Sequence, residues 1–286
     1  MHEEGWEPRW LRRTLLGYPG AMLSILFLLP LVSLLVFGFY THVSGRGLYE
    51  ARFTWANYAK ALEPFYLLRL WFTIWFSALT AAICLALGVP FTYVIAHLRS
   101  VALRRWIMGL TVSTLWLTDI VRAYGWSVLF SRTAGIGKLL AVLGLTAVPQ
   151  SYAPGFMATL VGMAYVYFPF MVLSLFGALR DMNPELEEAS MMLGAPRAYT
   201  MFHIVLPLIA RAMVIGTVFV FLLSVGTFII PDVLGSPAQW NTSVLITDAV
   251  VFNSNIPFGS ALSVVLAIVI GLPLLAFSSL ARQRRR

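Results

Sequence analysis

Long apolar runs, separated by short polar segments, dominate the chain. A helix needs about 20 mostly apolar residues to cross a membrane. Runs of this length predict six transmembrane helices, and their internal prolines are tolerated because neighbouring helices satisfy the freed backbone carbonyls. The predicted spans lie near residues 20–40, 71–96, 106–128, 156–179, 207–230 and 258–280.

The composition supports this pattern. The 286 residues are 59% hydrophobic and only 11% charged, with a mean hydropathy of +0.82, whereas soluble domains carry about a quarter charged residues. The chain is therefore expected to be an all-α integral membrane protein. The one cysteine, Cys84, excludes an intrachain disulfide. The net charge of +8 is attributed to loops that face anionic membrane lipid rather than to a nucleic-acid partner.

The distribution of basic residues predicts the orientation. Of the 20 Lys and Arg residues, 13 fall on one side of the predicted membrane, six on the other, and Arg122 lies within the third span. Cytoplasmic loops carry the excess of positive charge, so both termini are expected in the cytoplasm. The first span is too long, and lacks a small-residue cleavage site, for a signal peptide. We interpret it as an uncleaved anchor.

These assignments divide the chain into four segments. The longest is a membrane core that contains the polar loop 181–207. The segments are a cytoplasmic N-terminal segment (1–19), the first transmembrane helix with a periplasmic loop (20–65), the core (66–280) and a basic cytoplasmic tail (281–286).

The polar loop between the fourth and fifth spans reads EEASMMLGAPRAYTMFHIVLP over residues 187–207. Asn183 and Pro184 suit a helix start, and Gly194 permits a tight turn after about Leu193. Pro196 then suits the start of a second helix. This helix–turn–helix carries more apolar side chains than a solvated loop needs. Packing on its own bundle and docking to a partner protein both remain open from these residues alone.

The spacing in this loop resembles the EAA motif, E-A-A-x3-G-x9-I-x-L-P. This motif marks the permease subunits of binding-protein-dependent ABC importers, in which the loop docks on a cytoplasmic ATPase. Every spacing fits, and the one departure is a serine at the third position. The matching residues, which the resemblance implies couple the chain to the ATPase, are Glu188, Ala189, Ser190, Gly194, Ile204, Leu206 and Pro207.

The resemblance extends beyond the loop, over roughly residues 66–280. Segments 116–130, 162–190, 226–237 and 255–263 are similar to spermidine/putrescine-type permeases, in particular to the first permease subunit. Permeases for opines, aminoethylphosphonate, thiamine and ferric iron share parts of these segments and remain alternatives. A stand-alone secondary transporter is a further alternative, but no inverted repeat is visible.

The resemblance implies a six-helix type I ABC importer permease fold in a bacterial cytoplasmic (inner) membrane. The implied partners are a cytoplasmic ATPase dimer, a second homologous permease and a periplasmic or lipid-anchored solute-binding protein. The implied cargo is spermidine or putrescine. The chain itself is expected to bind no cofactor, because the ATPase uses the ATP.

The sequence predicts no catalytic or metal site. Residues 134–140 (AGIGKLL) superficially match a phosphate-binding loop, but Arg132 and Leu139 occupy positions that need Gly and Ser or Thr. The four histidines lack a metal-ligand spacing. The chain is therefore expected not to be an enzyme.

Charges near the outer end of the third span form a second candidate site. Asp119 and Arg122 are three residues apart, which places them on one face of a helix. Charges within a span usually face a bundle interior or water, so this pair either borders the translocation path or a subunit interface, or is a structural ion pair. The other candidate path residues are Tyr124, Trp126 and Asp232.

Overall fold

The computed structural model describes residues 9–43, 49–133, 135–144 and 150–283, and the side chains of residues 17–272 within these ranges. Within this part of the chain all regular elements are helices, apart from an isolated antiparallel bridge between Thr41 and Glu50. The predicted terminal segments 1–19 and 281–286 fall partly outside the described residues. The all-α prediction is confirmed.

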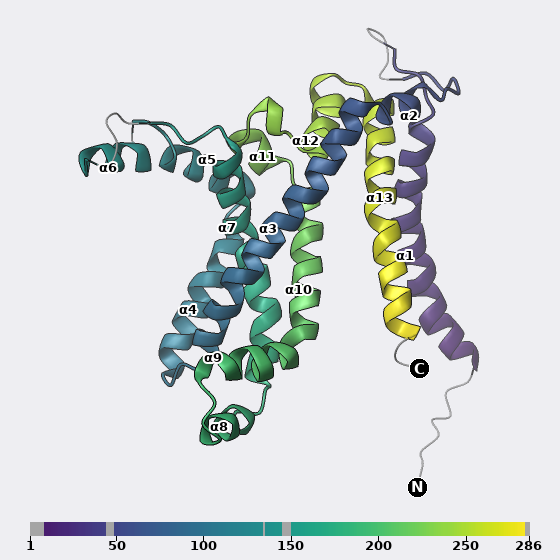
Figure 1. The fold of residues 1–286 in the computed structure, drawn as a ribbon. Helices are drawn as coiled ribbons and strands as arrows, with labels where there is room; N and C mark the ends of the chain where they lie inside the picture. Colours follow the sequence, from purple (N-terminus) through teal and green to yellow (C-terminus); the bar gives the residue numbers. More distant parts are fainter. Residues whose placement is uncertain (1–8, 44–48, 134, 145–149, 284–286) are drawn as a thin grey trace. The chain divides into compact units, whose positions relative to one another are not determined.

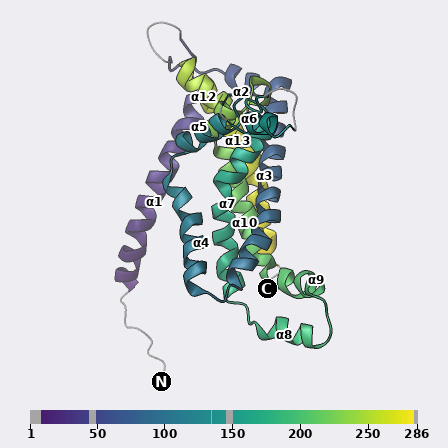
Figure 2. The ribbon, with the colours of Figure 1, turned by 90° about the vertical axis from the view of Figure 1, so that its left-hand side faces the viewer.

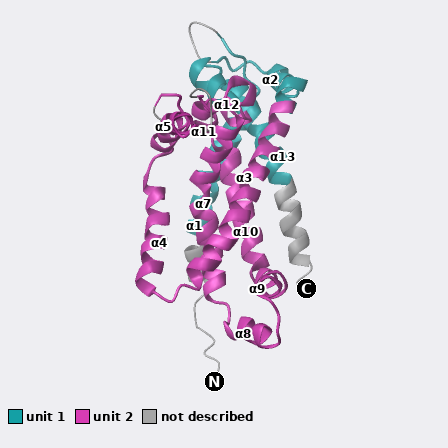
Figure 3. Cartoon of the chain, turned by 60° about the vertical axis from the view of Figure 1, so that its left-hand side comes forward, with its two compact units in different colours: residues 1–67, 245–286 teal, residues 68–244 magenta. Residues whose placement is uncertain are grey.

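The chain forms two compact units, residues 1–67 with 245–286 and residues 68–244 (Figure 3). In the first unit, α1 (Arg9–Phe37) packs against α13 (Ile256–Gln283), and α2 (Ala56–Ala61) also contacts α13. Asn57 joins α2 to the end of α1 by donating two hydrogen bonds, to the Gly38 and Tyr40 carbonyls at 3.0 and 2.8 Å. These bonds satisfy backbone carbonyls in the turn that follows α1.

The second unit holds the long helices α3, α7 and α10, which run side by side (Figures 1 and 2). α7 packs most extensively on α10, and α3 approaches α7 closely at Gly88, where an added Cβ would lie 2.8 Å from Met171 Cγ. The elements of this unit, from the point where α3 enters it, are α3 (Pro64–Ala96), α4 (Val101–Ser113), α5 (Asp119–Leu129), α6 (Ile136–Val142), α7 (Phe156–Arg180), α8 (Glu185–Met192), α9 (Arg197–Thr200), α10 (Leu206–Gly226), α11 (Ile229–Leu234) and α12 (Thr242–Thr247).

Four helical segments among the described residues are long and apolar enough to cross a membrane: Gly17–Phe37, Pro64–Ala96, Phe156–Arg180 and Arg197–Gly226. They contain most of the first, second, fourth and fifth predicted spans. α13 contains the whole of the sixth. The count of six spans and the cytoplasmic placement of both termini stay predictions.

The third predicted span, one helix over 106–128, is wrong. The chain leaves the helical conformation at Leu117 and Thr118, so α4 and α5 are separate helices. Thr118 has extended backbone, and its hydroxyl accepts a bond from the Val121 N–H at 3.4 Å, which caps the start of α5. Threonine followed by aspartate is a common helix-start signal. A hydropathy window averages over this signal.

Candidate functional site

The polar loop forms the predicted helix–turn–helix at one end of the second unit (Figure 2). α8 begins at Glu185, whose N–H donates to the Asn183 side chain at 3.0 Å. Three acidic residues in the first turn of α8 suit the positive end of its helix dipole. α9 begins after Pro196 and continues through a π-helical turn, Met201–Val205, into α10.

Gly194 ends α8 in the left-handed region, with φ of +86°. Its N–H donates to the Met191 carbonyl at 3.0 Å, and the Ala195 N–H donates to the Ser190 carbonyl at 3.2 Å. This pair of bonds is the Schellman arrangement, which satisfies the free carbonyls at a helix end and favours glycine. The predicted turn at Gly194 is therefore confirmed.

Ser190, the departure from the E-A-A pattern, has a structural partner. Its hydroxyl lies 3.0 Å from the hydroxyl of Thr200 on α9, and both residues are buried. The bond closes α8 against α9 across the Gly194 turn. A serine thus replaces a small apolar residue where a second hydroxyl faces it.

The remaining motif residues divide into exposed and packed positions. Glu188, Ala189 and Gly194 are exposed, and so is Pro207, whereas Ile204 and Leu206 are partly buried where the loop joins α10. The turn also exposes Met192 and Leu193, at 88% and 89%. An exposed carboxylate beside flexible apolar side chains can contact a protein partner.

Glu187, adjacent to the motif glutamate, was not singled out from the sequence. Although charged, it is 5% exposed. The Tyr93 hydroxyl donates to Glu187 Oε2 at 2.7 Å, and His97 Nε2 lies 3.1 Å from Oε1. Tyr93 lies in the last turn of α3, and His97 directly follows that helix. The sequence gives little indication of this role, because Glu187 and Glu188 are the same residue type. They differ only in which face of α8 each one occupies.

The second candidate site lies at the opposite end of the second unit, on α5 (Figure 1). Arg122 Nη2 donates to Asp119 Oδ1 at 2.6 Å, and Arg122 Nη1 donates to the Val166 carbonyl of α7 at 3.4 Å. The Arg122 side chain is 8% exposed and that of Asp119 is 36% exposed. The two charges therefore pair, as their spacing predicts, and the guanidinium also joins α5 to α7.

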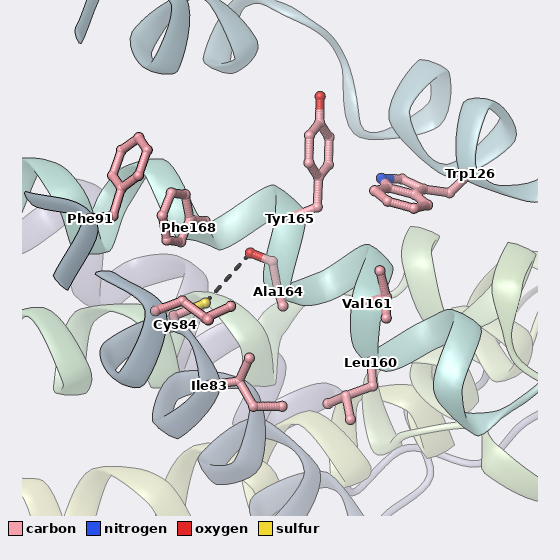
Figure 4. A pocket seen from close by; sticks show the side chains of 10 residues that line it. Ile83, Cys84, Phe91, Trp126, Leu160, Val161, Ala164, Tyr165 and Phe168 are labelled. Carbon is pink, nitrogen blue, oxygen red and sulfur yellow. Dashed lines mark hydrogen bonds between the residues drawn. The ribbon is translucent and has the colours of Figure 1, made fainter. Parts of the chain in front are cut away.

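The other predicted path residues divide between exposed positions and the wall of an apolar pocket. Tyr124 is 59% exposed, and Asp232 is exposed on α11 rather than in an irregular loop. Trp126 stacks on Phe130 and meets Tyr165 edge to face. Trp126 and Tyr165 line a pocket of about 520 Å³ between α3, α5 and α7, whose other walls are apolar (Figure 4). This pocket offers no charged group to a polar solute.

The sequence did not predict a buried cluster of hydrogen-bonded polar side chains around the end of α10. The backbone leaves the helix at Thr227, between α10 and α11. Asn241, which is 2% exposed, donates from Nδ2 to the Thr227 carbonyl at 2.8 Å and accepts from the Val244 N–H at 2.9 Å. Ser243 donates to the Val225 carbonyl at 2.7 Å. These side chains satisfy backbone groups that a helix break would leave unpaired in an apolar setting.

Comparison with known proteins agrees with this architecture. The chain is 28% identical to the spermidine/putrescine transport system permease protein PotB of Haemophilus influenzae over 86% of this chain and 85% of that protein. It is 30% identical to PotB of Salmonella typhimurium strain LT2, over 79% of this chain and 78% of that protein. Its fold matches a solved bacterial ABC transporter for alginate import with a TM-score of 0.76, at 16% identity and 96% coverage of both chains.

The profile of one protein family also matches. It covers residues 88–286, more than half of the chain, and includes the whole polar loop. Its description is the binding-protein-dependent transport system inner membrane component. The chain therefore belongs to this family of inner-membrane permease components.

Proposed function

We propose that the chain is the permease subunit of an ATP-driven importer for spermidine or putrescine. The observation that carries this proposal is the 28–30% identity to PotB proteins over most of both chains. In this role the chain forms half of a translocation path with a second permease. A solute-binding protein delivers the cargo, and cytoplasmic ATPases supply the free energy.

The loop of α8 and α9 is the proposed contact with the ATPase. Glu188 is exposed, and its carboxylate forms no hydrogen bond or ion pair with another residue that the structure describes. The apolar side chains of Met192 and Leu193 are almost fully exposed. A carboxylate of this kind can form a charge-assisted bond with an arginine of a docked subunit. ATP binding would then move α8, and the permeases would change between inward- and outward-facing states.

The charged groups of the chain add little to the choice of solute. Asp119 is neutralised by Arg122 at 2.6 Å, and Asp248 accepts a bond from Asn253 at 2.9 Å. Asp232 is exposed on α11 and remains a candidate contact for a cationic solute. The polyamine assignment therefore depends on the relatives, and the other solutes of such permeases are the alternatives to test.

The test is uptake of labelled spermidine by cells with and without this gene, in the presence of its partner genes. We expect uptake to stop when the gene is deleted and to return when the gene is restored. Intact polyamine uptake, together with loss of thiamine, opine, aminoethylphosphonate or ferric iron entry, would assign another solute to the same permease.

A second test addresses coupling. Glu188→Lys reverses an exposed charge without removing any bond within the loop. We expect the variant to insert normally and to lose both uptake and co-purification of the ATPase. Wild-type uptake by this variant would reject the loop as the ATPase contact, and uptake that needs no ATPase at all would favour a stand-alone secondary transporter.

A further inference from the structure

Three glutamates lie in the first turn of α8, and only one of them is buried. Glu185 and Glu188 are exposed, whereas Glu187 is 5% exposed. Burying a carboxylate is costly unless hydrogen bonds or an opposite charge compensate the lost water. A specific set of partners must therefore hold Glu187 in this position.

Both carboxylate oxygens of Glu187 have a partner, and each partner belongs to α3 or its end. The Tyr93 hydroxyl reaches Oε2 at 2.7 Å and His97 Nε2 reaches Oε1 at 3.1 Å. The centroids of the Tyr93 and His97 rings lie 4.2 Å apart, so the two rings pack against each other where they bind the carboxylate. The bonds join segments about 90 residues apart in the chain.

The second ring nitrogen of His97 adds a constraint. Nδ1 lies 2.9 Å from the Tyr93 carbonyl oxygen, which only accepts hydrogen bonds. Nε2 also faces an acceptor, the Glu187 carboxylate. A neutral imidazole carries one N–H, so both contacts are hydrogen bonds only when the ring is the imidazolium. In that form the pair is a salt bridge as well as a hydrogen bond.

We propose that Glu187 is a positioning residue that fastens α8 to the cytoplasmic end of α3, so that the two helices move together. This inference rests on the proposed function, in which α8 is the helix that the ATPase displaces. Besides these bonds, α8 is held to its unit by the short segment 181–184, by the Gly194 turn and the Ser190–Thr200 bond to α9, and by packing against the turn Met201–Val205. The bonds to Tyr93 and His97 connect α8 directly to the long helix α3, so a displacement of α8 would also move α3.

The assignment separates the two adjacent glutamates by role. Glu188 faces outward and contacts the ATPase, whereas Glu187 faces inward and transmits the motion. Loss of Glu188 is therefore expected to release the ATPase. Loss of Glu187 is expected to leave the ATPase bound and hydrolysing ATP, with less transport for each ATP consumed.

The experiment uses the whole importer in proteoliposomes, with the binding protein loaded with spermidine. Glu187→Leu keeps the side-chain bulk but removes both bonds, and Glu185→Leu is the matched exposed control on the same helix. We expect Glu187→Leu to lower the spermidine transported per ATP by about ten-fold, as for loss of hydrogen bonds to a charged group, with the ATPase still co-purifying. Glu185→Leu should retain the wild-type ratio.

Two further variants keep the proposal testable if Glu187→Leu fails to fold. Glu187→Gln should restore most of the ratio, because its amide oxygen accepts from Tyr93 and its NH₂ donates to a neutral His97. Tyr93→Phe with His97→Leu removes the same bonds from the α3 side and should reproduce the loss without any change in the loop. A wild-type ratio in folded Glu187→Leu, or in this double variant, would overturn the proposal.

The outcome is distinguishable from failure of the proposed function. If the wild-type chain binds no ATPase or moves no spermidine, the proposed function is wrong. If the wild-type importer works and the ratio is insensitive to Glu187, only the positioning role is wrong. Equal losses in Glu187→Leu and Glu185→Leu would also overturn it, because they would indicate a general disturbance of α8.

Discussion

The Ser190 hydroxyl lies 3.0 Å from the Thr200 hydroxyl, and this buried bond joins the helices on either side of the Gly194 turn. The residue at the third position of the motif is therefore small enough for the site and also forms a hydrogen bond there. Because the bond closes the loop that is proposed to meet the ATPase, the shape of that loop depends on it.

We expect Thr200→Val to destabilise the loop by about 1–2 kcal/mol, because it leaves the buried Ser190 hydroxyl without its partner. Adding Ser190→Ala should recover most of the loss, since removing both partners of a buried bond is nearly neutral. The measurement is the rate of protease cleavage between residues 185 and 205 in the purified protein. Strictly additive effects would show that the two hydroxyls do not interact.

Gly194→Ala is expected to cost about 1–2 kcal/mol in the same assay, because a Cβ disfavours the left-handed backbone. An added Cβ at this position meets no atom within 4 Å, so the cost would come from the backbone alone. Gly194→Asn should cost less than Gly194→Ala, since Asn tolerates this region better. Gly177→Ala, in the last turn of α7 and equally free of contacts, is the control and should be neutral or stabilising.

Asp119 and Arg122 are expected to respond unequally to substitution. Asp119→Ala leaves the Arg122 guanidinium, which is 8% exposed, without its charged partner. Arg122→Met leaves the Asp119 carboxylate without its partner, but that side chain is 36% exposed and can still contact water. Breaking a buried pair from one side costs more than replacing both members. The yield of folded protein should fall most for Asp119→Ala and recover in Asp119→Ala with Arg122→Met. A double variant worse than either single change would contradict this interpretation.

Asn241→Leu is expected to destabilise the second unit by about 2 kcal/mol or more, because it leaves the Thr227 carbonyl and the Val244 N–H unpaired in a buried site. Asn241→Asp should also be destabilising, since a carboxylate cannot donate to Thr227. Thermal unfolding of the purified protein in detergent measures both. Thr54→Val, at a hydroxyl that accepts one exposed backbone bond, is the comparison and should shift the unfolding midpoint much less.

The sequence by itself determined the helical class, five of the six predicted helices and the polar loop. Apolar runs of about 20 residues are a local property, and so are the acidic first turn of α8 and the glycine that ends it. The Gly194 turn needs only its own backbone and bonds to residues three and five positions earlier. The Asp119–Arg122 pair was predictable for the same reason, because both lie on one turn of one helix.

Only the tertiary structure decided which polar residues are paired inside. Glu187 and Glu188 are adjacent and chemically identical, and the phase of α8 against α3 buries one and exposes the other. Ser190 and Asn241 find partners across a turn and across a helix break. The break at Leu117 and Thr118 divided a run that we had predicted to form one span. Hydropathy records how apolar a segment is, whereas contacts between distant segments decide where a helix stops and which side chains it buries.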